Sequence, residues 1–457
     1  MADTTAAEAR RPPPSIGRLR WTIVLWLMVG GIINYLDRAV LSIAAPSMIA
    51  DLGLTRTDIG LMGTVFAWTY AVMQLPSGWL IDRLGAKRMF TGAMTLWSAA
   101  TVMTGAVTSF PALLSSRVVL GIGEAPCFPV FAKLTSVWFP RAERSLAAGF
   151  WDSSSKFGPA IAPIVLVGLL AAFGWRPLFF IAGGLGLAYA LCFALFYRDP
   201  AQEPRLSEGE RAHIAAGGGL AEQKSAVPLA TWAALFRTRA VWAMIGGYFC
   251  TIWIWNIFLV FLPLFLVDRF HLSLAQLGLY ASIPWLGGAL GEILSGWVGK
   301  QMVDWGVASP IDTKRRTIMV SSLLTAVLVA LLPGAGSIGA AIALMTAALF
   351  LISAITGSAW ALSADVAPTG MTASVGAIQN FGGYFGGALS PALCGFIVDR
   401  TGSYALAFWS GGIIAAGAAL FYMLGVRRPI VLPGMAGGPA QSAAAVGQSP
   451  SSALQDR

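Results

Sequence analysis

Twelve apolar stretches, each long enough to cross a lipid bilayer, limit the fold of this chain more than any other feature. A membrane-spanning helix needs roughly 20 mostly apolar residues. Charged residues make up only 11% of the chain, against about 25% in a soluble domain. We therefore predict an all-α membrane protein with twelve transmembrane helices. The expected spans are residues 20–46, 58–81, 88–108, 111–138, 145–172, 175–197, 240–267, 273–299, 316–334, 336–362, 371–398 and 402–426.

The distribution of Lys and Arg predicts the orientation in the membrane, because cytoplasmic loops carry an excess of both. With the N-terminus inside, 22 of the 30 basic residues lie in inner tails and loops, four lie in outer loops and four lie within spans. We expect a multi-pass protein of the cell inner (plasma) membrane with both termini cytoplasmic. The net charge of +9 then needs no nucleic-acid partner.

The longest polar interruption, residues 198–239, divides the spans six and six. Short similarities link the two sides: "SGWL" at Ser77 with "SGWV" at Ser295, and "FGPAIAP" at Phe157 with "FGGALSP" at Phe385. Similar offsets at separate places indicate an ancient duplication. The predicted organisation is a cytoplasmic tail (1–19), a six-helix bundle (20–197), a cytoplasmic linker (198–239), a second six-helix bundle (240–428) and a disordered cytoplasmic tail (429–457).

The segment "GWLIDRLGAKR" joins the second and third spans. Gly78 permits close helix approach, and Asp82 can pair with Arg83, with Arg88 or with a helix N-terminus of the other half. We expect this segment to act as a gate that holds one of two conformations; the alternative is a basic cytoplasmic turn. In the second copy Lys300 stands where the first has Asp82, and Asp304, one turn later, is a candidate substitute.

This segment resembles the signature loop of the major facilitator superfamily. With "NYLDR" at Asn34, "GIGEAPCFPVFAKLTSVWFPRAERSLAAG" at Gly121 and "GWRPLFFIAGGLG" at Gly174, the chain resembles the anion:cation symporter family, in particular bacterial galactonate and hexuronate transporters. The resemblance implies the major facilitator fold and import of an organic anion with a coupling cation. It implies protonation at Asp37 and Glu124, and substrate contacts by Tyr35, Arg38, Tyr70, Arg117 and Asn380.

Charged residues within the predicted spans are the main candidates for function. A charge at the bilayer centre costs about 2.5–3.5 kcal/mol on insertion scales, so such residues face the bundle interior and pair. Arg38 lies about 12 Å before Pro46 and Arg117 about 9 Å after Pro111 along their helices, so the two guanidinium groups could share one carboxylate. The embedded charges are Asp37, Arg38, Arg117, Glu124, Lys133, Asp152, Lys156 and Glu292.

Asp37 lies about 100° around the helix from Arg38, and we expect Asp37 and Glu124 to carry protons, because burial favours the neutral carboxyl group. The alternative is that both form structural salt bridges. Lys156 either pairs with Asp152 or meets a second anionic group of the substrate, such as the second carboxylate of glucarate or tartrate.

The remaining embedded residues divide between packing and substrate contact. Lys133 is expected to snorkel toward the inner surface, and Glu292 to pack between helices. At matching positions of the second half, Asn380 corresponds to Asp152 and Tyr384 to Lys156. We expect Trp360, Tyr70 and Asn380 to contact the hydroxyl groups and C–H face of a sugar acid.

The sequence predicts a secondary active transporter that imports an organic acid, of the galactonate, hexuronate or glucarate type, by proton symport. The alternatives are an anion exchanger, a non-transporting membrane sensor, and sodium in place of the proton. We expect a lipid-embedded monomer without cofactor or metal, since the four cysteines show no metal or disulfide spacing. An enzyme is not expected, because the two histidines, His213 and His271, lie in loops and no nucleophile constellation is present.

Overall fold

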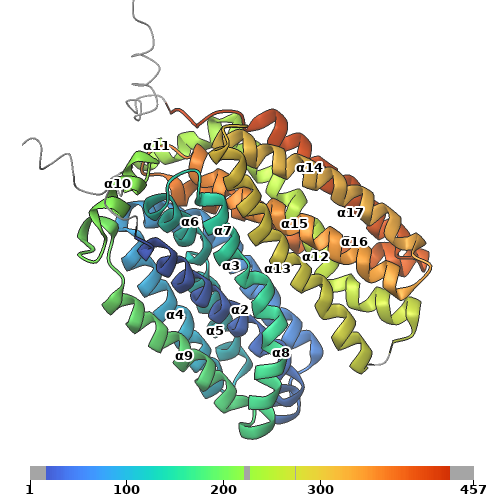
Figure 1. Cartoon of the computed structure of the whole chain (residues 1–457). Coiled ribbons are helices and arrows are strands. Elements are labelled where there is room, and N and C mark those ends of the chain that lie inside the picture. The colour runs from blue at the N-terminus through green and yellow to red at the C-terminus, as the bar shows by residue number, and fades with distance from the viewer. Residues whose placement is uncertain (1–16, 221–226, 273, 433–457) are drawn as a thin grey trace, which may run out of the picture.

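The computed structural model describes residues 17–220, 227–272 and 274–432, and these fold into two bundles of helices lying side by side (Figure 1). The first bundle contains α2 (Leu19–Leu52), α3 (Arg56–Leu84), α4 (Ala86–Ala106), α5 (Phe110–Glu124), α6 (Cys127–Trp138), α7 (Arg144–Asp152), α8 (Ser154–Phe173) and α9 (Trp175–Phe196). The second contains α12 (Arg239–Phe270), α13 (Leu274–Asp304), α14 (Pro310–Leu331), η3 (Leu332–Gly334), α15 (Ile338–Val366), α16 (Thr372–Thr401) and α17 (Ala405–Gly425). Between them lie η1 (Pro200–Gln202), α10 (Glu208–Ala216), α11 (Leu229–Ala233) and η2 (Ala234–Arg237).

The described helices match the twelve predicted spans when the pairs α5–α6 and α7–α8 are each counted as one span. Eight helical stretches of the described residues, one of them the α5–α6 pair, are long and apolar enough to cross a membrane. A ninth is added if the segments Arg144–Ala162 and Ile164–Phe173, bent by 42°, form one span. The helices α3, α4 and α13 are not among these, and we count them as spans because they pack within the bundles.

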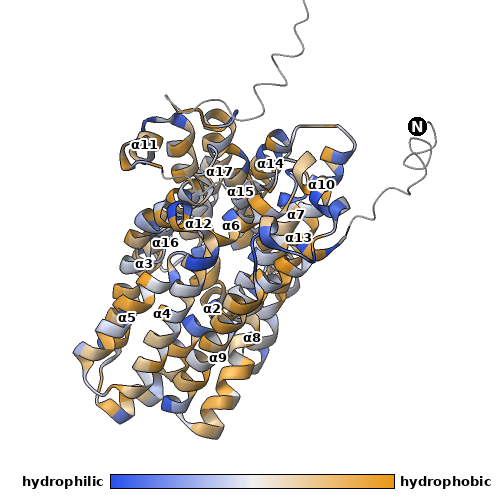
Figure 2. Ribbon diagram, turned by 90° about the vertical axis from the view of Figure 1, so that its left-hand side faces the viewer, coloured by the Kyte–Doolittle hydropathy of each residue, from blue (hydrophilic) through white to orange (hydrophobic). Residues whose placement is uncertain are grey.

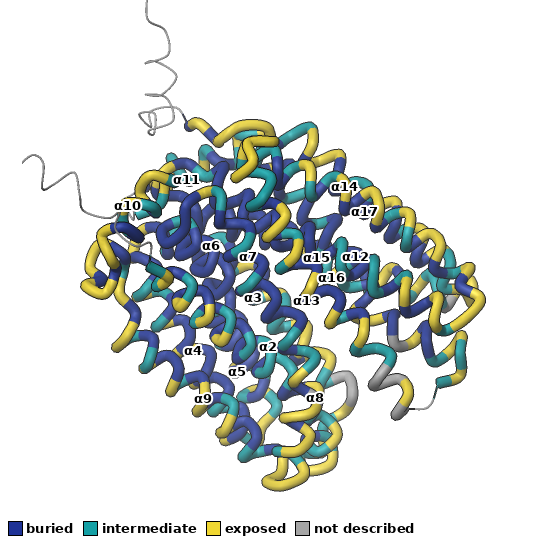
Figure 3. The backbone as a smooth tube through the Cα atoms, in the orientation of Figure 1, coloured by how far each residue is buried: buried dark blue, intermediate teal, exposed yellow. Residues whose placement is uncertain are grey.

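The outer surface of the bundles is suited to lipid. Many large apolar side chains are exposed on the outer helix faces; Ile164, for example, is 79% exposed and Ile413 is 76% exposed. An apolar surface of this size would be unfavourable in water. Figure 2 shows apolar residues along the outer faces of α8 and α9, and hydrophilic residues around α10. The buried residues lie inside each bundle and where the bundles meet (Figure 3).

Local signals explain where the helices turn. α2 ends at Leu52 and is followed by Gly53, whose φ of 63° lies in the left-handed region that glycine adopts without strain. α3 then begins with a capping box, in which Asp58 N donates to Thr55 Oγ1 and Thr55 N donates to Asp58 Oδ2. Two satisfied N-terminal donors fix the start of the second span.

The bundles touch at the end of the molecule where α10 and α11 lie, here called the linker end, and separate toward the opposite end (Figure 1). At the linker end α3 packs on α16, and α13 packs on α7. A Cβ atom added at Gly78 would lie 2.6 Å from Ala377 Cβ, and one added at Gly296 would lie 2.6 Å from the Ser145 carbonyl oxygen. Both glycines belong to the repeated "SGW" segment, so the internal repeat provides two close approaches between the bundles.

Candidate functional site

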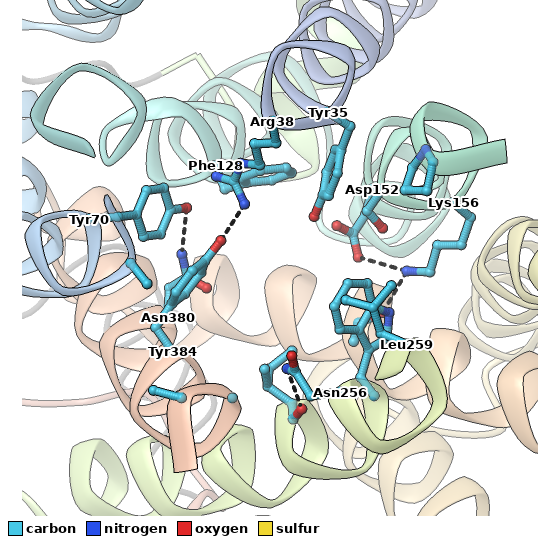
Figure 4. Close-up of a pocket in the computed structure, with 18 of the residues that line it drawn as sticks. Tyr35, Arg38, Tyr70, Phe128, Asp152, Lys156, Asn256, Leu259, Asn380 and Tyr384 are labelled. Carbon is cyan, nitrogen blue, oxygen red and sulfur yellow. Dashed lines mark hydrogen bonds and ion pairs between the residues drawn. The ribbon is translucent and has the colours of Figure 1, made fainter. Parts of the chain in front are cut away.

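A cavity of about 430 Å³ lies between the two bundles and is lined by residues of both (Figure 4). Six of the seven residues predicted to bind substrate line it, namely Tyr35, Arg38, Tyr70, Lys156, Trp360 and Asn380. Arg117 does not line it. Lining residues that the sequence did not single out as substrate contacts include Phe128, Asp152, Tyr248, Asn256 and Tyr384.

Arg38 of α2 is the cation on one side of the cavity. Its Nε donates to Glu124 Oε2 at 2.7 Å, and its Nη1 donates to the Tyr384 hydroxyl group across the cavity. Its Nη2 is buried and has no hydrogen-bond partner among the described residues. An arginine donor without a partner, in a cavity between the bundles, is suited to an anionic oxygen. Four aromatic rings surround the guanidinium group, those of Tyr35, Phe66, Tyr70 and Tyr384.

Asp37 faces away from Arg38, as the 100° step between successive helical residues predicts. Thr101 Oγ1 of α4 donates to both oxygens of Asp37, at 2.8 and 2.7 Å. Glu124 is fully buried, and its second oxygen has no hydrogen-bond partner among the described residues. Asp37 therefore lies behind the cavity wall, while Glu124 reaches the cavity through its ion pair with Arg38.

The predicted pair of guanidinium groups around one carboxylate is absent from this conformation. The Arg117 guanidinium lies 5.8 Å from the centre of the Phe179 ring, and the charges that act on it are those of Asp37 and Glu124. Counting residues from the helix ends gave the depth of Arg117 but not the direction in which it points around its helix.

The opposite side of the cavity carries a second cluster of charges. Lys156 Nζ forms an ion pair with Glu292 of the other bundle and lies 3.9 Å from Asp152 Oδ2. Thr356 Oγ1 donates to Glu292 Oε1 at 2.7 Å. Lys156 thus lies next to Asp152, as the first sequence alternative proposed. It also lines the cavity, as the second alternative, contact with an anionic group of the substrate, requires. The packing interpretation of Glu292 was incomplete, because Glu292 forms an ion pair between the bundles.

Neutral groups of the second bundle complete the cavity. Asn380 Nδ2 donates to the Tyr70 hydroxyl group at 3.3 Å, and the Tyr70 and Tyr384 rings lie 4.1 Å apart. Trp360 stacks on Phe128 at 6.0 Å. Asn380 and Tyr384 correspond in the repeat to Asp152 and Lys156, so the duplication places a charged pair and a neutral pair around the same space (Figure 4).

Asp82 ties the bundles together at the linker end. Its carboxylate accepts hydrogen bonds from the amide and hydroxyl groups of Ser374, at 2.8 and 2.7 Å, in the first turn of α16. Of the three partners predicted for Asp82, this helix N-terminus is the one in contact; Arg83 and Arg88 are exposed. The expectation that Lys133 snorkels is wrong, because Lys133 is buried and its Nζ lies 3.1 Å from Asp82 Oδ1.

A second tie at the linker end was missed from the sequence. Asp365 binds Arg144 Nη1 of the first bundle and Lys314 Nζ of the second, each at 2.8 Å. Asp365 falls just beyond the predicted span that ends at residue 362, and its partners are distant in the chain. Asp304 does not replace Asp82, because it forms an ion pair with Lys300 on the same helix.

The ion pairs of Asp365 with Arg144 and Lys314 predict the effect of a substitution on the thermal stability of the protein. Asp365→Asn leaves Arg144 and Lys314 buried without a counter-charge, and breaking a buried pair in this way costs about 3–5 kcal/mol. We expect a clearly lower melting temperature for the purified protein in detergent. Asp304→Asn, which removes an exposed carboxylate, is the matched control; equal melting temperatures for the two variants would contradict the role of Asp365.

The linker helix α10 is fixed to the first bundle. Glu210 accepts hydrogen bonds from the backbone amides of Leu19 and Arg20, at 3.1 Å each, and thereby caps α2. Glu143 binds Arg20 and His213. Burial alone would raise the pKa of Glu143, but the hydrogen bonds and charges of Arg20 and His213 outweigh it and lower the pKa. Glu143 therefore stays ionised and holds α10 in place.

Comparison with known proteins identifies the family. The Major Facilitator Superfamily profile matches residues 27–391. The chain belongs to the major facilitator superfamily. It is a multi-pass membrane transporter and not an enzyme, as predicted. Major facilitator transporters place their substrate sites between the two halves, and this cavity lies between the two bundles.

The chain is similar to several curated transporters over most of its length. It is 36% identical over 415 residues to the probable L-galactonate transporter of Escherichia coli (strain K12), covering 91% of each chain. It is 31% identical to the probable galactarate/D-glucarate transporter GudP of the same strain (89% of this chain, 93% of the relative). It is 32% identical to the probable sulfoacetate transporter SauU of Cupriavidus necator (84% and 89%).

Solved structures confirm the predicted fold class. The outward conformation of the transporter FucP superposes with a TM-score of 0.69 at 15% identity, covering 90% of this chain and 100% of that one. The proton:xylose symporter XylE gives 0.69 at 16% identity, covering 89% and 96%. At these identities the similarity concerns the fold alone.

Proposed function

We propose that this transporter imports a sugar-acid anion by proton symport with alternating access. The observation that carries the proposal is the arrangement around Arg38, a guanidinium group with a spare buried donor, bound to a buried carboxylate, in a cavity between the bundles. The names of the relatives, which include L-galactonate and galactarate/D-glucarate transporters, support sugar acids as the substrate class. Tyr35, Tyr70, Trp360 and Asn380 supply hydrogen bonds and ring faces for the polyhydroxy chain.

Arg38 couples substrate binding to proton binding, because its guanidinium group can pair either with Glu124 or with the carboxylate of the substrate. While Glu124 is ionised it neutralises Arg38, and a substrate carboxylate must compete with it. Protonation of Glu124 leaves the Arg38 charge available, so anion and proton favour each other's binding. Asp37 provides a second buried carboxyl group behind the cavity wall, and the charges of both carboxyl groups act on Arg117.

The number of protons decides what drives accumulation. One proton with a monoanion is electroneutral, so only the proton gradient acts. A second proton adds a net positive charge, and a membrane potential of 100 mV then contributes about 2.3 kcal/mol, or roughly 50-fold accumulation. Asp37 and Glu124 together permit the two-proton case.

The conformation corresponds to the outward-facing state in this proposal. The excess of Lys and Arg supports a cytoplasmic position for the linker end. The ties at Asp82 and Asp365 then close the cytoplasmic side, while the bundles separate toward the outside (Figure 1). Occupation by substrate and proton would let the bundles rock around the cavity and break these ties.

Uptake into proteoliposomes tests the proposal. The purified protein is reconstituted, and an inward proton gradient is applied with radiolabelled galactonate, glucuronate or glucarate outside. We expect accumulation of at least one acid above equilibrium, and loss of accumulation with a protonophore. Accumulation driven by sodium alone, counterflow without any gradient-driven uptake, or binding without transport would replace proton symport by sodium symport, exchange or sensing, respectively.

Gly78 tests alternating access. Gly78→Val would place side-chain atoms against Ala377 and the backbone of α16, so the linker end could no longer close as it does here. We expect uptake to fall at least about tenfold, while galactonate binding by the solubilised protein is retained. Gly63→Val is the control, because a Cβ atom at this glycine of the same helix meets nothing within 4 Å. Normal uptake by Gly78→Val would contradict the gate.

A further inference from the structure

The two sides of the cavity differ in how their charges are balanced. On the α2 side, Arg38 and Arg117 face two carboxylates, Asp37 and Glu124. On the opposite side, Lys156 alone faces two carboxylates, Asp152 and Glu292. Lys156, Asp152 and Glu292 are at most 4% exposed, so water screens their charges little. Figure 4 shows Arg38 and Lys156 on different sides of the cavity, with Tyr35 between them.

Lys156 has no positive charge to spare for a ligand. Its ammonium group contacts Glu292, Asp152 and the hydroxyl group of Thr356. A second carboxylate brought to this side would lose its water and find no free counter-charge, which is costly in a buried site. It would also approach the carboxylate of Asp152, which lines the cavity and carries a like charge.

The same side of the cavity is suited to hydrogen-bond donors. Asp152 lines the cavity, and its Oδ2, 3.9 Å from Lys156 Nζ, is buried. The Ser155 hydroxyl group, also buried on the cavity wall, has no hydrogen-bond partner among the described residues. An ionised carboxylate only accepts hydrogen bonds, so its partner must be a donor. A hydroxyl group of a ligand can donate to Asp152, whereas a carboxylate of a ligand cannot.

We propose that the Asp152–Lys156–Glu292 cluster makes this transporter select acids that carry one carboxylate and a hydroxylated tail, and reject the corresponding dicarboxylates. The single carboxylate lies at Arg38 and the tail points toward Asp152. This inference rests on the proposed function and narrows it, because of the sugar acids considered it retains aldonates and uronates and excludes aldarates such as glucarate. Specificity then comes from a repulsive element as well as from attraction.

Galactonate and galactarate provide a matched pair of probes. Both have the same six-carbon chain, and they differ in one terminal group, which is a hydroxymethyl group in galactonate and a carboxylate in galactarate. Displacement of radiolabelled galactonate from the purified protein is measured with each unlabelled acid at one fixed pH. We expect galactarate to bind at least about tenfold more weakly, since one unfavourable charge contact in a buried site is worth more than about 1.4 kcal/mol.

Variants of the cluster test the cause. Glu292→Gln and Asp152→Asn each remove one carboxylate and release part of the Lys156 charge, so the preference for galactonate should fall roughly tenfold, mainly through stronger galactarate binding. The two variants are measured separately, so that misfolding of one leaves the other as the test. Asp304→Asn, far from the cavity lining, is the control and should keep the wild-type preference.

The outcomes separate this inference from the proposed function. Equal binding of the two acids by the wild type overturns the selection of monocarboxylates. If folded Glu292→Gln and Asp152→Asn keep the wild-type preference for galactonate over galactarate, other residues determine the selection, and the role of the cluster is overturned. Failure of the wild type to bind galactonate overturns the inference, while uptake of none of galactonate, glucuronate and glucarate overturns the proposed function itself.

Discussion

Arg38→Ala is expected to weaken galactonate binding about a hundredfold. The substitution removes the guanidinium group whose unpartnered Nη2 is available to the substrate carboxylate. Truncating one partner of a buried, hydrogen-bonded charge pair costs about 2–5 kcal/mol, and 1.4 kcal/mol is a factor of ten. Binding is measured by displacement of radiolabelled galactonate from the purified protein, so that a defect in the transport cycle does not enter.

Two variants separate the charge of Arg38 from its geometry. Arg38→Lys keeps a positive charge but loses the planar fork that binds Glu124, Tyr384 and a ligand together, so we expect an intermediate loss. Arg83→Ala removes an exposed arginine that lies over Trp79 and should bind galactonate normally. If Arg38→Ala bound galactonate within a few-fold of the wild type, the substrate carboxylate would have to lie elsewhere.

The sequence identified those parts of the cavity that depend on one helix or on the repeat. Arg38 and Asp37 stood out because charges within an apolar span are costly and must pair. Their different directions, about 100° apart around the helix, followed from helical geometry alone. For Asp152 and Lys156, four residues apart, pairing was one of two alternatives, because that spacing places them on one face. Asn380 and Tyr384, which the duplication matches to Asp152 and Lys156, line the same cavity, although Tyr384 was not predicted as a substrate contact.

Contacts between the bundles could not be predicted in this way. Lys156 and Glu292 are 136 residues apart, and Arg144 and Asp365 are 221 residues apart. No periodicity relates such positions, because their contact depends on how the bundles pack. The error at Lys133 has the same origin: a lysine near a helix end usually snorkels, but here a buried Asp82 lies within reach. Arg117 shows that depth in the membrane does not define a site unless the helix rotation is known.

Glu124→Gln is expected to abolish accumulation driven by the proton gradient while preserving exchange of galactonate across the membrane. Glutamine has nearly the same shape and can still accept a hydrogen bond from Arg38 Nε, so the cavity should stay intact. It carries no charge and takes up no proton. Arg38 is then permanently available to the anion, and substrate binding no longer requires a proton. Uptake under an inward proton gradient and counterflow without a gradient are measured on the same proteoliposomes.

The pH dependence of binding distinguishes coupling at Glu124 from a merely structural role. In the wild type, galactonate and proton favour each other, so the affinity should rise as the pH falls. In Glu124→Gln this dependence should flatten, with affinity at high pH equal to or above that of the wild type. Asp37→Asn, which keeps the hydrogen-bonding shape beside Thr101, shows whether the second carboxyl group contributes a separate proton. A Glu124→Gln variant that still accumulated galactonate with the proton gradient would leave the ion pair with Arg38 a structural salt bridge and place the coupling at Asp37.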